Sequence, residues 1–219
     1  MSILSVLTAK PWEAAQARAD DFHFGGTFAL PTEKLGLRVF LAVVTILFLL
    51  LIMAYGVRME SEDWRPTPEL RLLWLNTVLL VIGSVAMQWA RVSARRHDMD
   101  GVRFGMLAGG VFAVAFLVGQ IVAWRQLNSL VVFDIANPAI AFFFLITGLH
   151  GLHLLVGLVV LGRTASKVWR GAGAAEVRLS VELFTIYWHY LLLIWLVLFG
   201  LLFSGNDNLE FLLAICGLK

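Results

Sequence analysis

Charged side chains are scarce in this sequence, and their scarcity decides the class of protein. Only 15% of the 219 residues are Asp, Glu, Lys or Arg, whereas a soluble domain carries about 25%. Hydrophobic residues make up 60% of the chain and the mean hydropathy is +0.84. An ordinary water-soluble domain is therefore excluded. The formal net charge of +2 is too small to indicate binding of nucleic acid.

Cysteine is nearly absent as well. The chain has one, Cys216, close to the C-terminus. A single cysteine excludes a disulfide within the chain, a CxxC redox pair and a CxxCH haem attachment. We expect Cys216 to be a small apolar side chain in a hydrophobic tail.

Long apolar runs are abundant, and they predict an all-α, polytopic membrane bundle. A span needs about 20 mostly apolar residues, and five stretches qualify. They lie at about 36–56, 70–90, 104–124, 138–162 and 182–203. Residues 31–219 are thus predicted to form one transmembrane domain, in which 208–217 are too few to span. Residues 1–30 lack the basic start of a signal peptide and are predicted to lie at the membrane surface.

The distribution of Lys and Arg predicts the orientation, because cytoplasmic loops carry an excess of both. The N-terminal segment and the second and fourth connections hold 12 of them, and the opposite side holds five. We therefore expect a cytoplasmic N-terminus and a periplasmic C-terminus. The 12 are Lys10, Arg18, Lys34, Arg38, Arg91, Arg95, Arg96, Arg103, Arg163, Lys167, Arg170 and Arg178; the five are Arg58, Arg65, Arg71, Arg125 and Lys219.

The interiors of the predicted spans contain no Asp, Glu, Lys or Arg. Ion pumps and channels usually need such residues at membrane depth, so this chain is not expected to move ions by itself. Histidines are the main candidates for chemistry. His150 and His153 occur in TGLHGLH on the fourth span, and His189 occurs in YWHY on the fifth. His153 and His189 are predicted at similar depths on neighbouring helices.

Three interpretations of these histidines remain open. Two histidines on one helical turn can share a metal with His189 as a third ligand, or one can pair with His189 on a haem. Contact with a lipid headgroup or a partner subunit is the second. We favour the third, in which neutral imidazoles form hydrogen bonds between helices, because no fourth protein ligand is evident.

Other polar and small residues in the spans are typical of helix packing. Asn76 and Thr77 on the second span and Gln120 on the third are expected to form hydrogen bonds between helices. Gly105 and Gly109 make a GxxxG pattern, which allows two helices to approach closely.

Taken together, these segments resemble subunit III of the haem-copper cytochrome c and quinol oxidases, in its five-helix bacterial form. The similarity covers all five spans. It rests on the order and spacing of motifs: a segment around Asn76 and Thr77, a glutamine with an aromatic residue four positions later, TGxHGxH, and YWHY preceded by a glutamate. The residues that carry it, and to which we assign structural roles between helices, are Asn76, Thr77, Gln120, Thr147, His150, His153, Glu182, Trp188, His189 and Trp195.

The resemblance implies a non-catalytic subunit in a bacterial inner membrane that sustains aerobic electron transport and proton uptake. It implies no catalytic, cofactor-binding or metal-binding residue in this chain; haems and copper belong to partner subunits. The expected partners are the catalytic subunit I, other oxidase subunits and phospholipids, without nucleic acid. Lipid is expected in a cleft between the first two spans and the last three, with Arg38 and Arg91 at its inner rim.

The sequence departs from the family's pattern at buried carboxylate positions, which are occupied here by Val44, Ala123 and Leu192. These departures favour a divergent branch, and one alternative is the subunit III-like accessory subunit of a nitric oxide reductase. An independent membrane haem or metal protein is a second alternative. A small-molecule transporter is disfavoured by the few polar groups in the spans.

Overall fold

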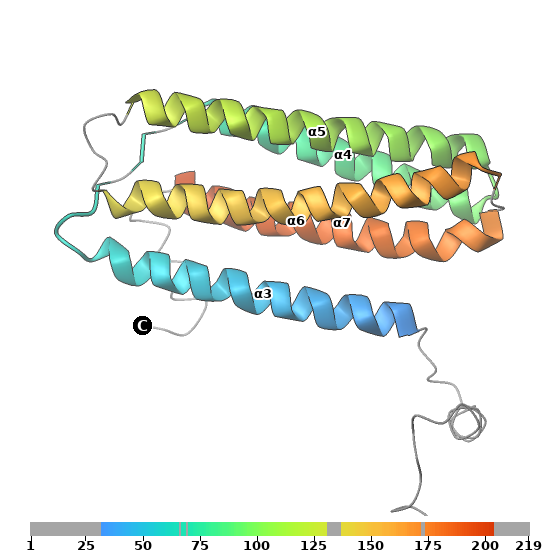
Figure 1. Ribbon diagram of the computed structural model, residues 1–219, viewed down its shortest axis with the longest axis horizontal. Coiled ribbons are helices and arrows are strands. Elements are labelled where there is room, and N and C mark those ends of the chain that lie inside the picture. The colour runs from blue at the N-terminus through green and yellow to red at the C-terminus, as the bar shows by residue number, and fades with distance from the viewer. Residues whose placement is uncertain (1–31, 66, 69, 131–136, 172–173, 204–219) are drawn as a thin grey trace, which may run out of the picture. The chain divides into compact units, whose positions relative to one another are not determined.

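The computed structural model describes residues 32–65, 67–68, 70–130, 137–171 and 174–203, which contain five α-helices (Figure 1). Expectations about residues 1–30, residues 208–217 and Cys216 fall outside the described residues. Consecutive helices run in opposite directions (Figure 1). The helices are α3 (Thr32–Met59), α4 (Leu72–Arg95), α5 (Met99–Leu130), α6 (Pro138–Trp169) and α7 (Ala174–Phe203).

The all-α prediction and the five spans are confirmed. All five helices are long and apolar enough to cross a membrane. Each extends beyond its predicted span at one end or both, since apolar runs mark only the part that lies in hydrocarbon. With 32 residues each, α5 and α6 are about 48 Å long at 1.5 Å per residue, against about 30 Å of hydrocarbon. Their polar ends therefore reach the headgroup region.

The start of α6 is defined by Asn137 and Pro138. The Asn137 side chain accepts a hydrogen bond from the backbone N–H of Ala139 at 3.0 Å, which caps the helix, and Pro138 suits the first helical position. Asn137 Nδ2 also donates to the carbonyl of Arg65 at 2.9 Å. One side chain thus begins α6 and ties the connection between α3 and α4 to it.

A tight turn joins α4 to α5. His97 has a φ of 59°, a left-handed conformation that is uncommon for a residue other than glycine. The Asp98 N–H returns to the carbonyl of Ser93 at 3.0 Å, and the Asp98 carboxylate accepts from the Gly101 N–H at 3.1 Å. This short connection holds α4 and α5 antiparallel and adjacent.

Small residues allow α5 to lie directly against α4. A Cβ on Gly105 would lie 2.7 Å from the Ala86 carbonyl oxygen and 2.8 Å from the Ala90 Cβ. A Cβ on Gly109 would lie 2.6 Å from the Met87 sulfur. Both glycines of the predicted GxxxG pattern therefore face α4, and the expectation of a close helix contact is confirmed.

The chain divides into two units, Met1–Phe40 and Leu41–Lys219. In the first, the described residues form the first turns of α3. In the second, α4 packs against α5 and α7, and α6 packs against the same two helices. The remainder of α3 packs on α6 and α7 through an apolar cluster (Figure 1). The buried members of that cluster are Val44, Phe48, Tyr55, Ile146, Ile194, Leu198 and Leu201.

This packing corrects the expected division of the helices. The first two spans were predicted to stand apart from the last three, with lipid in a cleft between them. Instead, α4 contacts α5 and α7 directly, because the small residues of α5 let the two helix backbones approach closely. The fold is a four-helix core of α4–α7, with α3 from Leu41 onward packed on α6 and α7.

Candidate functional site

His150 lies at the centre of the helix core, where aromatic rings enclose it. Its side chain has no exposed surface. The ring centroids of Phe48 on α3, Phe116 on α5 and Trp195 on α7 lie 6.5, 5.8 and 5.2 Å from the imidazole centroid. Phe116 also meets Trp195 edge to face at 4.8 Å. The imidazole is a packing element that joins four helices.

Two indole groups in the core bond to threonines in the same manner. Trp195 Nε1 donates to Thr77 Oγ1 at 3.0 Å, and Thr77 Oγ1 donates to the Leu73 carbonyl one turn earlier at 2.8 Å. Trp124 Nε1 donates to Thr147 Oγ1 at 3.0 Å. A hydroxyl has one proton and two lone pairs, so each threonine can satisfy its own helix and still accept from a neighbouring one. The bond to Thr77 links α7 to α4, and the bond to Thr147 links α5 to α6.

Three further polar side chains occupy the core without such bonds. Asn76, Gln120 and His150 are almost fully buried, and their side-chain nitrogen and oxygen atoms have no hydrogen-bond partner among the described residues. Asn76 packs directly over Gly119, where a Cβ would collide with its side chain. The structure thus places Asn76 and Gln120 inside the core as expected, but it shows packing there rather than the predicted hydrogen bonds.

His189 bridges α7 and α4 through both ring nitrogens. Nδ1 lies 2.6 Å from Ser84 Oγ, and Nε2 lies 3.2 Å from Gln88 Oε1. Because an amide oxygen only accepts, Nε2 donates to Gln88, and either Nδ1 or the Ser84 hydroxyl can be the donor in the other bond. The imidazole thus links two helices.

His153 contacts its own helix, α3 and α7. Its Nδ1 lies 2.8 Å from the Leu149 carbonyl on its own helix, and its ring centroid lies 5.6 Å from that of Phe48. Its backbone carbonyl accepts a hydrogen bond from the Tyr187 hydroxyl at 2.7 Å. The link between α6 and α7 at this level is therefore made by Tyr187.

The surroundings of the histidines can be compared with the interpretation that these residues bind a metal ion. Within the described part of the chain, no three or more His, Cys, Asp or Glu residues are placed to hold a metal ion. His150 is enclosed by rings, and His189 uses both nitrogens on α4. The arrangement can cross-link and stiffen the helices.

Three further predicted residues, Glu182, Trp188 and Arg38, have different surroundings. Glu182 lies 3.2 Å from Arg91 and 3.9 Å from Arg95, so one carboxylate of α7 pairs with two guanidinium groups of α4. Trp188 is buried against Phe184, with ring centroids 5.2 Å apart. Arg38 is exposed on the first turns of α3, and its expected role in lipid binding stays a prediction.

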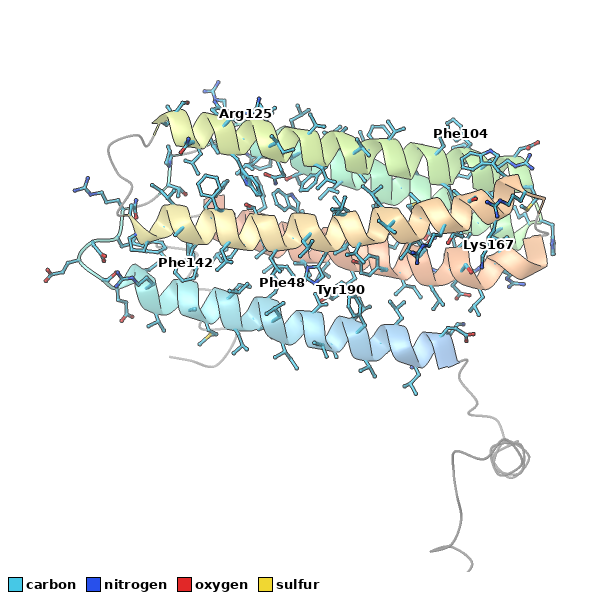
Figure 2. All side chains as sticks on the ribbon, in the orientation of Figure 1. Phe48, Phe104, Arg125, Phe142, Lys167 and Tyr190 are labelled. Atoms are coloured by element: carbon cyan, nitrogen blue, oxygen red, sulfur yellow. The ribbon has the colours of Figure 1, made fainter. Side chains whose placement is uncertain are left out.

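Sequence reasoning missed several polar groups that link helices. Ser84 and Gln88, the partners of His189, are four residues apart on one face of α4, and that spacing was the available signal. The Tyr190 hydroxyl lies 2.8 Å from Thr45 Oγ1 and donates to the Leu41 carbonyl at 3.2 Å, which anchors α3 to α7. Figure 2 shows Tyr190 between these two helices. No pattern in the sequence predicts the contact between Tyr190 and Thr45, because the two residues are 145 positions apart.

Replacing His189 by Leu should loosen α7 from α4. Each hydrogen bond between membrane helices contributes roughly 0.6–2 kcal/mol, and the change also leaves the Ser84 hydroxyl buried without its partner. We expect a lower unfolding temperature of the chain in detergent. His153→Leu should cost less, because the His153 ring bonds to its own helix and Tyr187 keeps its carbonyl partner.

Ser84→Ala supplies the control for that comparison. If the pair acts through its hydrogen bond, Ser84→Ala should cost little more in a His189→Leu background, as a double-mutant cycle reveals. Fully additive losses would show that the bond does not stabilise the chain.

The chain is similar to known proteins of one family. Residues 34–205 match the family described as cytochrome c oxidase subunit III. The cytochrome c oxidase subunit 3 of Thermostichus vulcanus is 32% identical over 179 residues, which cover 77% of this chain and 85% of that protein. That of Synechocystis sp. is 31% identical over 179 residues, covering 77% and 73%. A probable cytochrome c oxidase subunit 3 of Mycobacterium tuberculosis is 30% identical over 152 residues, covering 64% and 71%.

Proposed function

Because the chain belongs to the cytochrome c oxidase subunit III family, we propose that it packs against the catalytic subunit I of a terminal oxidase that oxidises cytochrome c. It is a multi-pass membrane protein and a non-catalytic subunit of a haem-copper oxidase. In the proposed complex, the haems and copper belong to the partner subunits. This chain supports the catalytic subunit during aerobic electron transport and proton uptake.

The observation that carries this proposal is that polar side chains within the helices form contacts between helices. Trp195, Trp124 and His189 each donate or accept between helices, and the His150 ring is enclosed by aromatic rings of three other helices. Groups engaged in this way hold helices at fixed positions. A rigid helix core is what a supporting subunit requires.

The proposed location is a bacterial inner membrane, with the N-terminus in the cytoplasm. The excess of Lys and Arg in the N-terminal segment and in alternate connections supports this orientation. The exposed surfaces of α3–α7 are rich in Leu, Val and Ile, which suits contact with lipid chains and with a partner's membrane helices. Retained phospholipid is part of the proposed role.

Purification of a tagged chain in mild detergent tests the proposal. We expect the complex to contain a haem-copper catalytic subunit, to show its haem spectrum and to consume oxygen with reduced cytochrome c. The tagged chain expressed without its partners should show no haem absorbance. A nitric oxide reductase catalytic subunit in its place would support the alternative accessory role, and stoichiometric haem on the isolated chain would overturn the non-catalytic assignment.

A further inference from the structure

Three polar side chains on three different helices are buried in the core with no hydrogen-bond partner among the described residues. We propose that Asn76, Gln120 and His150 together bind internal water, and that this water links α4, α5 and α6 at the centre of the core. The site lies wholly within this chain. The inference therefore does not depend on the identity of the partner subunits.

Asn76 and Gln120 are held at the same contact between α4 and α5. A Cβ on Gly119 would collide with the Asn76 side chain, so the asparagine lies directly against this point of α5. Gly119 immediately precedes Gln120 in the chain. The side chains of Asn76 and Gln120 are 0% and 3% exposed. Both amides are therefore inside the core and close to the line where the two helices meet.

His150 lies at the same level, on α6. Its imidazole contacts Phe116 of α5, with ring centroids 5.8 Å apart, and Phe116 is one turn before the buried glutamine on the same face of the helix. The imidazole also contacts Trp195 of α7. The Trp195 indole in turn donates to Thr77, which follows the buried asparagine on α4. This circuit of contacts places the three unpartnered side chains in one layer of the core.

The chemistry of this layer calls for a small ligand that can both donate and accept. Each amide has an acceptor oxygen and two N–H donors, and a neutral imidazole has one donor and one acceptor. All six side-chain nitrogen and oxygen atoms are buried without a partner in the described part of the chain. A buried polar atom without a hydrogen bond loses the solvation that it has in water. Internal water relieves that cost in folded proteins, and each such molecule makes about three hydrogen bonds.

The polar neighbours of the layer are already engaged. Trp195 Nε1 donates its proton to Thr77, and the Thr77 hydroxyl donates its own to the Leu73 carbonyl at 2.8 Å. On the core face of α5, one turn after the buried glutamine, the fully buried residue is Ala123, which places only a methyl group beside the amide. A water molecule is small enough to lie among such groups and to bridge amides and an imidazole on different helices.

X-ray hydroxyl-radical footprinting of the chain, purified with its partner subunits, tests this water site. Radicals formed from a bound water label the side chains that touch it, even where bulk solvent does not reach. We expect labelling of His150 and Trp195, although neither side chain is exposed. Met87 is equally buried and its thioether is easily oxidised, but it lies about 16 Å along α4 from Asn76 at 1.5 Å per residue. Met87 should stay unlabelled.

Gln120→Leu removes one amide and leaves an apolar side chain in its place. Labelling of His150 and Trp195 should then fall to the level of Met87, because the water loses an anchor. Thr164→Val is the matched control. The Thr164 hydroxyl is also buried, but it donates to a carbonyl of its own helix at 3.0 Å and lies about 21 Å along α6 from the imidazole at 1.5 Å per residue. Its removal should leave the labelling unchanged.

A cryo-EM map of the same complex that resolves water is a second measurement and requires no variant. A density peak within hydrogen-bond distance of the Gln120 amide and of either Asn76 or His150 would support the site. Direct hydrogen bonds among these three side chains, without such a peak, would overturn it. The site is also overturned by unlabelled His150 and Trp195, by equal labelling of Met87, or by wild-type labelling in Gln120→Leu.

Discussion

Trp195→Ala is expected to cause a large loss of stability. Trp195 is fully buried and contacts Phe116 and His150, and its indole bonds to Thr77. Removing a buried Trp costs about 3–5 kcal/mol in soluble cores. Lipid chains are as apolar as the side chains they replace, so membrane helices associate mainly through packing and hydrogen bonds. We therefore expect a cost of about 3 kcal/mol.

The measurement is thermal unfolding of the purified chain in detergent, together with the amount of this subunit in the purified complex. Trp89→Ala is the matched control, because Trp89 is 58% exposed on the same bundle and its loss leaves no cavity in the core. Trp195→Ala should reduce both values while the haem spectrum of the catalytic subunit is unchanged. Equal effects of the two variants would contradict the assigned role of Trp195 in the core.

Gly105→Leu should separate α4 from α5, with a second large effect. Even a Cβ at this position would lie 2.7 Å from the Ala86 carbonyl oxygen and 2.8 Å from the Ala90 backbone nitrogen. Both are backbone atoms, which cannot rotate away as a flexible side chain can. Overpacking of this kind typically costs about 1–3 kcal/mol, occasionally more. We expect Gly105→Ala to destabilise the chain and Gly105→Leu to prevent its accumulation in the membrane.

Gly200→Leu serves as the control, because the space beside that glycine is open. The effects are read as the amount of folded chain in membranes and as the unfolding temperature in detergent. Alanine has a higher helix propensity than glycine, so local propensity alone would make Gly105→Ala stabilising. A rise in the unfolding temperature of Gly105→Ala would therefore show that α4 and α5 do not pack as closely as described.

The candidate site was predicted in part. Thr77, Thr147, Trp188 and Trp195 are in the core and were named from the motifs that carry the family resemblance. The partners of these residues were not predictable, because a residue's depth along a helix does not say which neighbouring helix it faces. His153 and His189 illustrate this: their predicted depths are similar, yet His189 bonds to α4 and His153 bonds to its own helix.

The expected lipid cleft shows the same limit. Arg91 was expected at the rim of a lipid cleft, and in the structure it pairs with Glu182. An apolar groove between α5 and α6, lined by Leu107, Gly110, Leu158 and Gly162 among other residues, has no sequence signature, since its lining residues are ordinary apolar and small residues of two helices. Only their juxtaposition makes it a groove.

The sequence by itself determined the class, the number of spans and the family. These follow from the composition and order of residues along one chain, because each span must bury its own backbone hydrogen bonds in lipid and be apolar over about 20 residues. The tertiary structure alone decided which helices touch. In lipid, apolar surface does not distinguish one neighbour from another, so the arrangement depends on small residues such as Gly105 and on bonds such as that of Trp195 to Thr77.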